Sequence, residues 1–213
     1  MKQKIGVLGS GDVAQTLAKG FKAKAYDVRI GTRDPAKLAS FSREAGVPSG
    51  SFQAVADHGD LIVLAVKGTA ALSVLEMAGA AALAGKVVID TTNPIADAPP
   101  DQGILRYFTE PNHSLMETLQ AKYPKARFVK AWNSVGHAFM VDPKLSGGPP
   151  TMFYCGNDAD GKASVAGLLV EFGWQVEDIG GAAGARALEP LCQLWCAPGF
   201  LRNEWAHAFK VLR

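Results

Sequence analysis

The sequence has few cysteines and no long hydrophobic run. Three cysteines among 213 residues do not predict a disulfide framework. Cys192 and Cys196 lie four residues apart without a further ligand at metal-binding spacing, so we predict buried thiols, no metal site and a cytoplasmic location. The most apolar window, residues 70–85, is interrupted by Glu76 and is too short to cross a bilayer. Asp12 interrupts the N-terminal apolar run and no cleavage pattern follows, so we predict neither a membrane partner nor a signal peptide.

An excess of charge of one sign is also missing. The 22 basic and 20 acidic residues leave a net charge of +2, and the sequence has no block of basic residues. The charge therefore does not indicate a nucleic-acid partner. The sequence contains no G-x-S-x-G motif and no paired carboxylates in a catalytic context, so no side chain is predicted as catalytic. The composition, 48% hydrophobic and 20% charged, is that of a globular protein.

Short apolar runs alternate with helical patterns for most of the length. Runs such as LIVLAV and KVVID are typical of strands covered on both faces. Strands are predicted at Lys4–Leu8, Tyr26–Ile30, Leu61–Val66, Lys86–Asp90, Arg127–Ala131, Met152–Cys155 and Gln175–Ile179. Helices are predicted at Val13–Ala25, Pro35–Ala45, Thr69–Leu83, Ser114–Lys122 and Asp158–Phe172, with Asp34 and Asn112 as N-caps. The alternation predicts an α/β fold, a Rossmann-type doubly wound and mostly parallel sheet with a small C-terminal helical extension.

A glycine-rich turn follows the first predicted strand. Gly9, Gly11 and Ala14 have the spacing G-x-G-x-x-A where the next helix begins. Gly9 allows a tight turn, Gly11 lets the backbone approach a pyrophosphate, and Ala14 lets the helix pack close to the strand. The anion would face the helix N-terminus, where free N–H groups and the helix dipole favour negative charge. We therefore predict a dinucleotide-binding turn.

The end of the second strand carries a cation where NAD-binding proteins carry an acid. An Asp or Glu about 20 residues beyond the glycines hydrogen-bonds the adenosine ribose in NAD sites. Here Asp27 lies about 15 Å away, at the wrong end of the strand. Thr32, Arg33 and Lys37 stand there instead, and a ribose phosphate would be repelled by a carboxylate but bound by these residues. The cofactor predicted is NADP(H), although a solvated Arg33 is the alternative.

Three further segments follow strands and should line the crevice at their carboxyl ends. In the first, Lys67 is either a cofactor contact or a solvated residue, and Asn93 in the second either fixes a turn or meets the nicotinamide amide. The third holds a polar cluster in which a substrate contact by His137 competes with a structural role. The residues predicted from these segments to contact the cofactor are Ala65, Val66, Lys67, Asn93, Pro94 and Ala131, and those to contact the substrate are Asn133, Ser134 and His137.

The chain resembles the coenzyme F420-dependent NADP oxidoreductase family, which transfers hydride between NADPH and a deazaflavin. The motifs that carry the resemblance are GSGDVA, GTRDPAK, VLAVK, VKAWNSVGHAF, CGNDADGKA and IGGAAGARALEPL. The resemblance implies pyrophosphate contacts from Ser10, Gly11, Asp12 and Val13, phosphate contacts from Thr32, Arg33 and Lys37, and nicotinamide contacts from Val66, Lys67, Gly68 and Leu72. It departs where family reductases often carry a histidine, at Asn133, and a G-P-L turn, at residues 180–182, where Ala182 is expected near the substrate.

After residue 179 the alternation ends. Residues 182–198 and 199–213 have the pattern of two apolar helices broken near Pro198–Gly199, which should pack on the sheet, on a partner subunit in a homodimer, or on both. Arg186 and Glu189 fit either the family's tail or a surface i,i+3 ion pair. We divide the chain into an NADP-binding Rossmann domain, residues 1–150, and residues 151–213, which complete the substrate pocket and the expected dimer interface.

Three functions are compatible with this sequence. The first is an NADPH-dependent oxidoreductase whose small-molecule partner is a flavin or a deazaflavin such as coenzyme F420. The second is a dehydrogenase or imine reductase of a small substrate, although such enzymes add a large helical domain and only about 30 residues follow the last predicted strand here. The third is a non-catalytic NADP(H) sensor.

Overall fold

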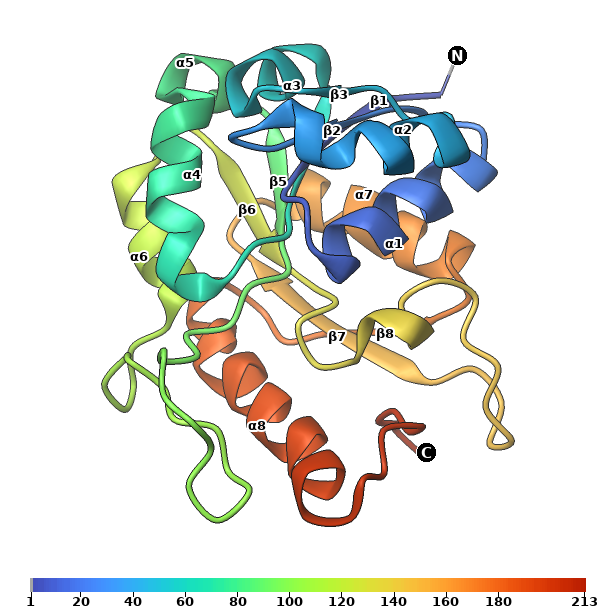
Figure 1. Cartoon of the computed structure of the whole chain (residues 1–213). Coiled ribbons are helices and arrows are strands. Elements are labelled where there is room, and N and C mark those ends of the chain that lie inside the picture. The colour runs from blue at the N-terminus through green and yellow to red at the C-terminus, as the bar shows by residue number, and fades with distance from the viewer. Residues whose placement is uncertain (1) are drawn as a thin grey trace.

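The strands of residues 2–213, the part of the chain that the computed structural model describes, form one sheet in the order β3-β2-β1-β4-β5-β6-β7-β8 (Figure 1). The neighbouring strands are parallel except for the antiparallel pair β6 and β7. The strands are β1 Lys4–Leu8, β2 Asp27–Gly31, β3 Ser49–Gly50, β4 Leu61–Leu64, β5 Val87–Asp90, β6 Arg127–Lys130, β7 Thr151–Gly156 and β8 Gln175–Asp178. The predicted fold class is confirmed. The strand order reverses beside β1, where doubly wound sheets bind ligands.

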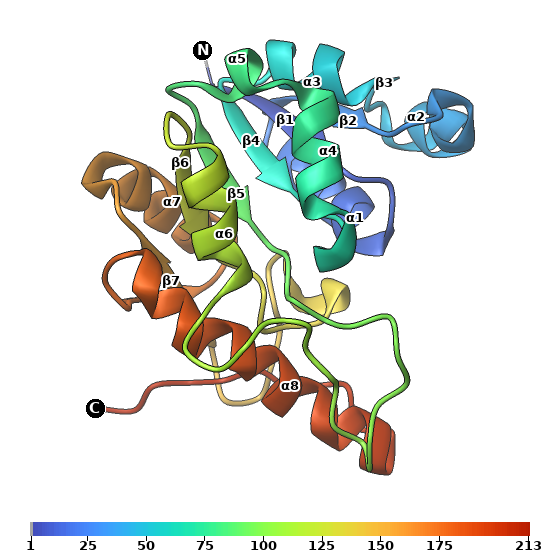
Figure 2. The ribbon, with the colours of Figure 1, turned by 90° about the vertical axis from the view of Figure 1, so that its left-hand side faces the viewer.

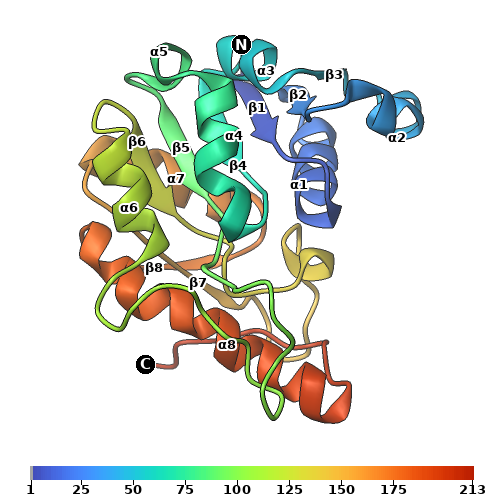
Figure 3. The ribbon, with the colours of Figure 1, turned by 60° about the vertical axis from the view of Figure 1, so that its left-hand side comes forward.

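Helices cover both faces of the sheet (Figure 3). Successive strand residues face opposite cores, as in β4, where Val63 packs with α1, α2 and α7 while Ile62 and Leu64 pack with α3, α4, α6 and α8. The helices are α1 Asp12–Ala23, α2 Ala39–Ala45, α3 Phe52–His58, α4 Ala71–Ala78, α5 Ala80–Leu83, α6 Leu115–Lys122, α7 Ala159–Glu171 and α8 Ala185–Arg202. Short 3-10 turns are η1 Pro35–Leu38, η2 Gly68–Ala70, η3 His137–Phe139 and η4 Ala182–Gly184. In the part of the chain described, no helix combines the length and the apolar character needed to cross a bilayer.

Most predicted elements are present, with ends shifted by one or two residues, and the exceptions have local causes. The helix predicted at 69–83 is interrupted at Gly79, whose positive φ of 89° is incompatible with a continuous helix. Asp34 caps η1 as predicted, by accepting a hydrogen bond from Ala36 N. Asn112 does not cap α6, because Ser114 does so in a reciprocal capping box with Glu117. β3 and α3 were not predicted from the sequence.

The prediction of two C-terminal helices is wrong. α8 continues through Pro190 and Pro198 to Arg202, and Asn203 ends it in the left-handed conformation with a φ of 57°. The chain then returns along α8 without regular secondary structure, as Figure 2 shows. Trp195 and His207 tie this return segment to α8: their rings stack at 5.0 Å between centroids, and Trp195 Nε1 donates to the carbonyl of His207.

Candidate functional site

A groove of about 610 Å³ runs along the carboxyl ends of β1, β2 and β4. It lies at the strand reversal, between α1, the loop after β2 and α4. Eleven of the residues predicted to hold the cofactor line it: Gly9, Ser10, Gly11, Asp12, Val13, Thr32, Arg33, Lys37, Ala65, Val66 and Lys67. Residues far apart in the sequence therefore meet where the crevice was predicted.

The glycine-rich turn has the geometry that its sequence predicts. Gly9 has a φ of +145°, and a Cβ there would collide with the backbone carbonyl of Ala65. Gly11 differs, because a Cβ there would meet no atom within 4 Å and would project into open space. Gly11 is also the N-cap of α1 and supplies no side-chain acceptor to the amides of the first turn. Packing thus requires glycine at 9 but not at 11.

The far end of the groove is positively charged. Arg33 and Lys37 are exposed on its wall, and neither takes part in an ion pair within residues 2–213. Thr32 is buried beside them, with its N–H bonded to the carbonyl of Gly50. Asp27 lies at the opposite end of β2, where its carboxylate is 3.5 Å from His58 Nε2. The corner therefore holds two cations that the protein itself does not neutralise.

A second hollow, of about 590 Å³, adjoins this groove and shares Val13, Val66, Lys67 and Thr91 with it. The predicted Gly68 and Asn93 line this hollow. Its remaining lining residues come from the segment after β5: Thr92, Ile95, Ala96, Asp97, Ala98 and Pro99. Lys67 is largely exposed and lies 3.7 Å from Asp97, so this pair is weak.

The other predicted residues lie outside the two hollows, except for His137, which lines the first. Leu72 is exposed on α4, whereas Pro94, Ala131, Asn133 and Ser134 are buried. Asn133 connects Asn93 to α8, because its Nδ2 donates to Asn93 Oδ1 at 3.0 Å and to the carbonyl of Leu188 at 2.8 Å. Ala182 lines a separate hollow together with Glu117, so the structure does not bring it to the groove.

Sequence analysis missed one wall of the groove. Phe52 contributes from α3, an element that was not predicted. One face of η2 and α4 also contributes, with the i, i+3, i+4, i+7 spacing of a helix: Ala70, Ser73, Val74 and Met77.

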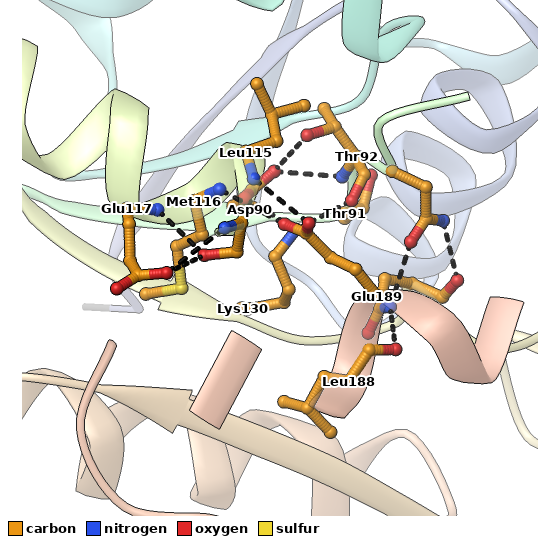
Figure 4. Close-up of polar contacts among 12 residues, drawn as sticks. Asp90, Thr91, Thr92, Leu115, Met116, Glu117, Lys130, Leu188 and Glu189 are labelled. Carbon is orange, nitrogen blue, oxygen red and sulfur yellow. Dashed lines mark hydrogen bonds and ion pairs between the residues drawn. The ribbon is translucent and has the colours of Figure 1, made fainter. Parts of the chain in front are cut away.

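A buried polar cluster supports the segment that follows β5 (Figure 4). Lys130 is completely buried, and its Nζ contacts three acceptors: Asp90 Oδ2 at 2.8 Å, Glu189 Oε1 at 3.0 Å and the Thr92 carbonyl at 2.7 Å. Burial lowers the pKa of Lys130, but Asp90 and Glu189 together raise it by more, so the net shift is upward. The ammonium therefore stays charged. We call Lys130, Asp90 and Glu189 the charge cluster.

Glu189 does not form a surface pair with Arg186. Arg186 instead makes a bidentate contact with Glu117 of α6, with an Nη2–Oε1 distance of 2.6 Å. The hydrogen bonds from Arg186 are the largest cause that lowers the pKa of Glu117, to about 2. The i,i+3 interpretation is wrong because successive turns of α8 face different neighbours: Arg186 lies at the surface beside α6, and Glu189 points into the core.

Comparisons with known proteins agree with this geometry. The model of the family described as NADP oxidoreductase, coenzyme F420-dependent, matches residues 4–94. A crystal structure of a candidate F420-dependent NADP-reductase from Arthrobacter sp. FB24 is 35% identical, covers 100% of both chains and has a TM-score of 0.93. The chain belongs to this family. The F420-dependent NADP oxidoreductase family consists of NADP-dependent enzymes, and the resemblance recognised from the motifs is thus confirmed.

Two more distant proteins are similar to most of the chain. Metalloreductase STEAP3 of Rattus norvegicus is 27% identical over 188 residues, which are 88% of this chain but 36% of that protein. This chain thus spans about a third of the length of that relative. A reductive aminase from Aspergillus terreus, in complex with NADPH and ethyl levulinate, is 18% identical, with a TM-score of 0.66 over 91% of this chain and 60% of the other. That likeness shows the fold alone.

The two glycines of the turn should respond differently to alanine. Gly9→Ala places a Cβ against the Ala65 carbonyl at a strained φ, and should lower the free energy of unfolding by about 2 kcal/mol or more. Gly11→Ala enters open space at an ordinary φ of −80°, and should leave the free energy of unfolding unchanged or raise it by about 0.5 kcal/mol. Urea denaturation measures both, and equal losses would contradict the distinction.

Proposed function

We propose that this oxidoreductase binds NADPH in the groove and transfers hydride between NADP(H) and a flavin or a deazaflavin. The observation that carries the cofactor assignment is the pair of exposed, unneutralised cations, Arg33 and Lys37, at the end of β2. A carboxylate there would select the ribose hydroxyls of NAD, whereas two cations beside Thr32 favour the additional phosphate of NADP. The guanidinium of Arg33 can also stack on adenine.

The turn fits the rest of the dinucleotide. The open space beside Gly11 allows backbone amides to reach a pyrophosphate, and the dipole of the 12-residue helix α1 favours an anion there. The adenosine end would then lie at Arg33 and the exposed side of α4. The nicotinamide half would extend towards Val66, Gly68 and Asn93 in the second hollow.

When bound, NADPH supplies the hydride, and the chemistry needs little from the protein beyond placement. Val13 and Val66 offer apolar surface at the junction of the two hollows, where they can exclude water from the ring. Asn93 offers an amide at the wall of the second hollow, although its Nδ2 already donates to the carbonyl of Asn133 at 2.8 Å. Orientation of two planar redox partners is sufficient for a large rate gain.

The lining of the second hollow favours the proposal of a planar organic acceptor. Its wall after β5 is mostly apolar, with Ile95, Ala96, Ala98 and Pro99, and it adjoins the expected nicotinamide position. Of the three residues predicted to contact the substrate, Asn133 and Ser134 are buried, whereas His137 lies on the wall of the first groove, where a substrate could reach it. A small carbonyl or imine substrate is the second candidate, because reductive aminases use the same fold for such substrates.

Replacement of Arg33 tests the cofactor assignment. Arg33→Ala should weaken NADPH by about ten- to a hundred-fold, because a hydrogen bond to a charged group is worth roughly 1.5–3 kcal/mol, and should change NADH affinity little. Arg43→Ala is the matched control, since Arg43 is an exposed cation outside the groove lining. Isothermal calorimetry provides both affinities, and equal losses of NADPH and NADH would refute the phosphate site.

Anaerobic stopped-flow oxidation of NADPH tests the acceptor. Flavin, deazaflavin and a panel of small carbonyls and imines are compared at equal concentration, and we expect turnover with a flavin or deazaflavin. Turnover with imines or carbonyls alone would favour the second candidate. Tight NADPH binding without turnover of any acceptor would favour a sensor.

We also propose that residues 151–213 provide a homodimer interface. Their part in the substrate pocket would be indirect, through Glu189 of α8, because none of them lines either hollow. The loop that follows β5 lies beside the C-terminal half of α8 (Figure 2). Five large apolar side chains of these two segments are exposed: Ile104, Phe108, Leu194, Phe200 and Leu201. Gln193 Nε2 donates to the carbonyl of Leu105, so this loop is attached to α8.

Light scattering tests the interface. The native chain should have the mass of a dimer, and Leu201→Glu should shift it towards the monomer because a charge would have to be buried. Glu76→Lys, a charge change on the exposed face of α4, should leave the mass unchanged. A monomeric native chain would refute the interface.

A further inference from the structure

The charge cluster lies directly behind the second hollow. The ammonium of Lys130 donates a hydrogen bond to the Thr92 carbonyl and forms ion pairs with the carboxylates of Asp90 and Glu189. Asp90 uses its other oxygen, Oδ1, to accept from Thr92 N at 2.9 Å and from Thr92 Oγ1 at 2.7 Å. Thr92 is thus held through its N–H, its hydroxyl and its carbonyl by two charged residues of adjacent strands.

The third member of the cluster connects this turn to two helices. Glu189 Oε2 accepts from Leu115 N at 3.0 Å and Oε1 accepts from Met116 N at 3.1 Å, so the carboxylate of α8 binds the N-terminus of α6. Its negative charge is stabilised there by the helix dipole and by Lys130. One buried carboxylate therefore sets the distance between α6, α8 and β6.

Asn93 is fixed by a parallel set of contacts. Its side-chain amide exchanges hydrogen bonds with Asn133, which also donates to the carbonyl of Leu188 on α8. A Cβ on Gly68 would collide with the Asn93 carbonyl, so the turn also lies in close contact with η2. The segment Thr91–Asn93, which we call the threonine turn, is held on every side except the one that faces the hollow.

A gain in folding stability does not by itself explain why three charged side chains are buried together. Bringing three charged groups out of water costs free energy that their attraction only partly offsets, and apolar replacements of buried ion pairs are often neutral or stabilising. What charged, directional contacts supply in addition is a fixed position for the groups that they bind. The group bound here is a wall of the hollow that the proposed function assigns to the nicotinamide half.

We propose that Lys130, held by Asp90 and Glu189, is a positioning residue that fixes the threonine turn as the wall against which the nicotinamide half is oriented. The inference rests on the proposed function. It places no part of the charge cluster in contact with the cofactor, and the residues that act directly are Thr92 and Asn93, which line the hollow.

Two conservative changes at Thr92 test the inference without removing a buried charge. Thr92→Val deletes the hydroxyl that donates to Asp90 and preserves the volume, whereas Thr92→Ser preserves the hydroxyl. Two ligands are titrated by calorimetry: NADPH, which occupies both halves of the groove, and adenosine 2′,5′-bisphosphate, which occupies only the phosphate half. Thr118→Val is the matched control, since its hydroxyl bonds only within the region of α6.

We expect Thr92→Val to weaken NADPH by about ten-fold, because a turn that is no longer held by Asp90 must be ordered when the nicotinamide half binds, with the bisphosphate within about two-fold of the native protein. Thr92→Ser should restore NADPH binding, and Thr118→Val should bind both ligands normally. Amide hydrogen exchange at residues 91–93, measured without ligand, should be faster in Thr92→Val and in Lys130→Met. These results together support the positioning role.

Equal weakening of both ligands by Thr92→Val would show a general structural effect and overturn the inference. Unchanged binding of both would overturn it too, as would failure of Thr92→Ser to restore binding. If the native chain binds neither ligand, the proposed function itself fails, a result that is separate from any difference between the variants.

Discussion

The structure depends on one completely buried ammonium group. Lys130 joins β6 to β5 through Asp90 and to α8 through Glu189, and Glu189 in turn binds the first amides of α6. Each partner would be costly to bury alone, because an unpaired charge in a protein interior is strongly destabilising. The four elements are therefore held in one arrangement, and the Thr91–Asn93 turn that emerges among them has little freedom. The shape of the second hollow follows from this arrangement.

The other end of the groove follows the opposite principle. Arg33 and Lys37 are exposed and have no carboxylate partner within residues 2–213, so their charge remains available to an anion. Asp34 lies next to them, but its carboxylate accepts from Ala36 N. The cluster at Lys130 neutralises charge internally and fixes position, whereas the corner at Arg33 leaves charge unsatisfied and provides attraction. A dinucleotide needs both, since its phosphates provide binding energy and its nicotinamide ring must be oriented.

How well each region could be predicted depends on how far apart in the sequence its contacting residues lie. The turn at Gly9 and Gly11, the cap at Asp34 and the cations at Arg33 and Lys37 depend on residues close in sequence. Local patterns of this kind were sufficient to predict the fold class, seven of the eight strands and many residues that line the first groove. The charge cluster joins residues 90, 130 and 189, and no local pattern contains that information. The same reason explains the erroneous surface pair of Arg186 and Glu189: sequence spacing shows that two side chains share a helix, not what each one meets.

The course of the C-terminus shows how tertiary contacts override a local signal. Pro198 and Gly199 have the pattern of a helix break, yet α8 continues past them because Trp205 packs on Gly199, where any side chain would collide with its ring. Trp195 then stacks on His207, and the N–H of Thr151 bonds to the carbonyl of Phe209, so the return segment also reaches β7. Glu189 and the Leu188 carbonyl, which contact the side chains that hold the threonine turn, lie near the start of α8 and well before Pro198. The wall of the hollow therefore depends on the first turns of this helix, and the return segment holds the part of α8 that lies beyond them.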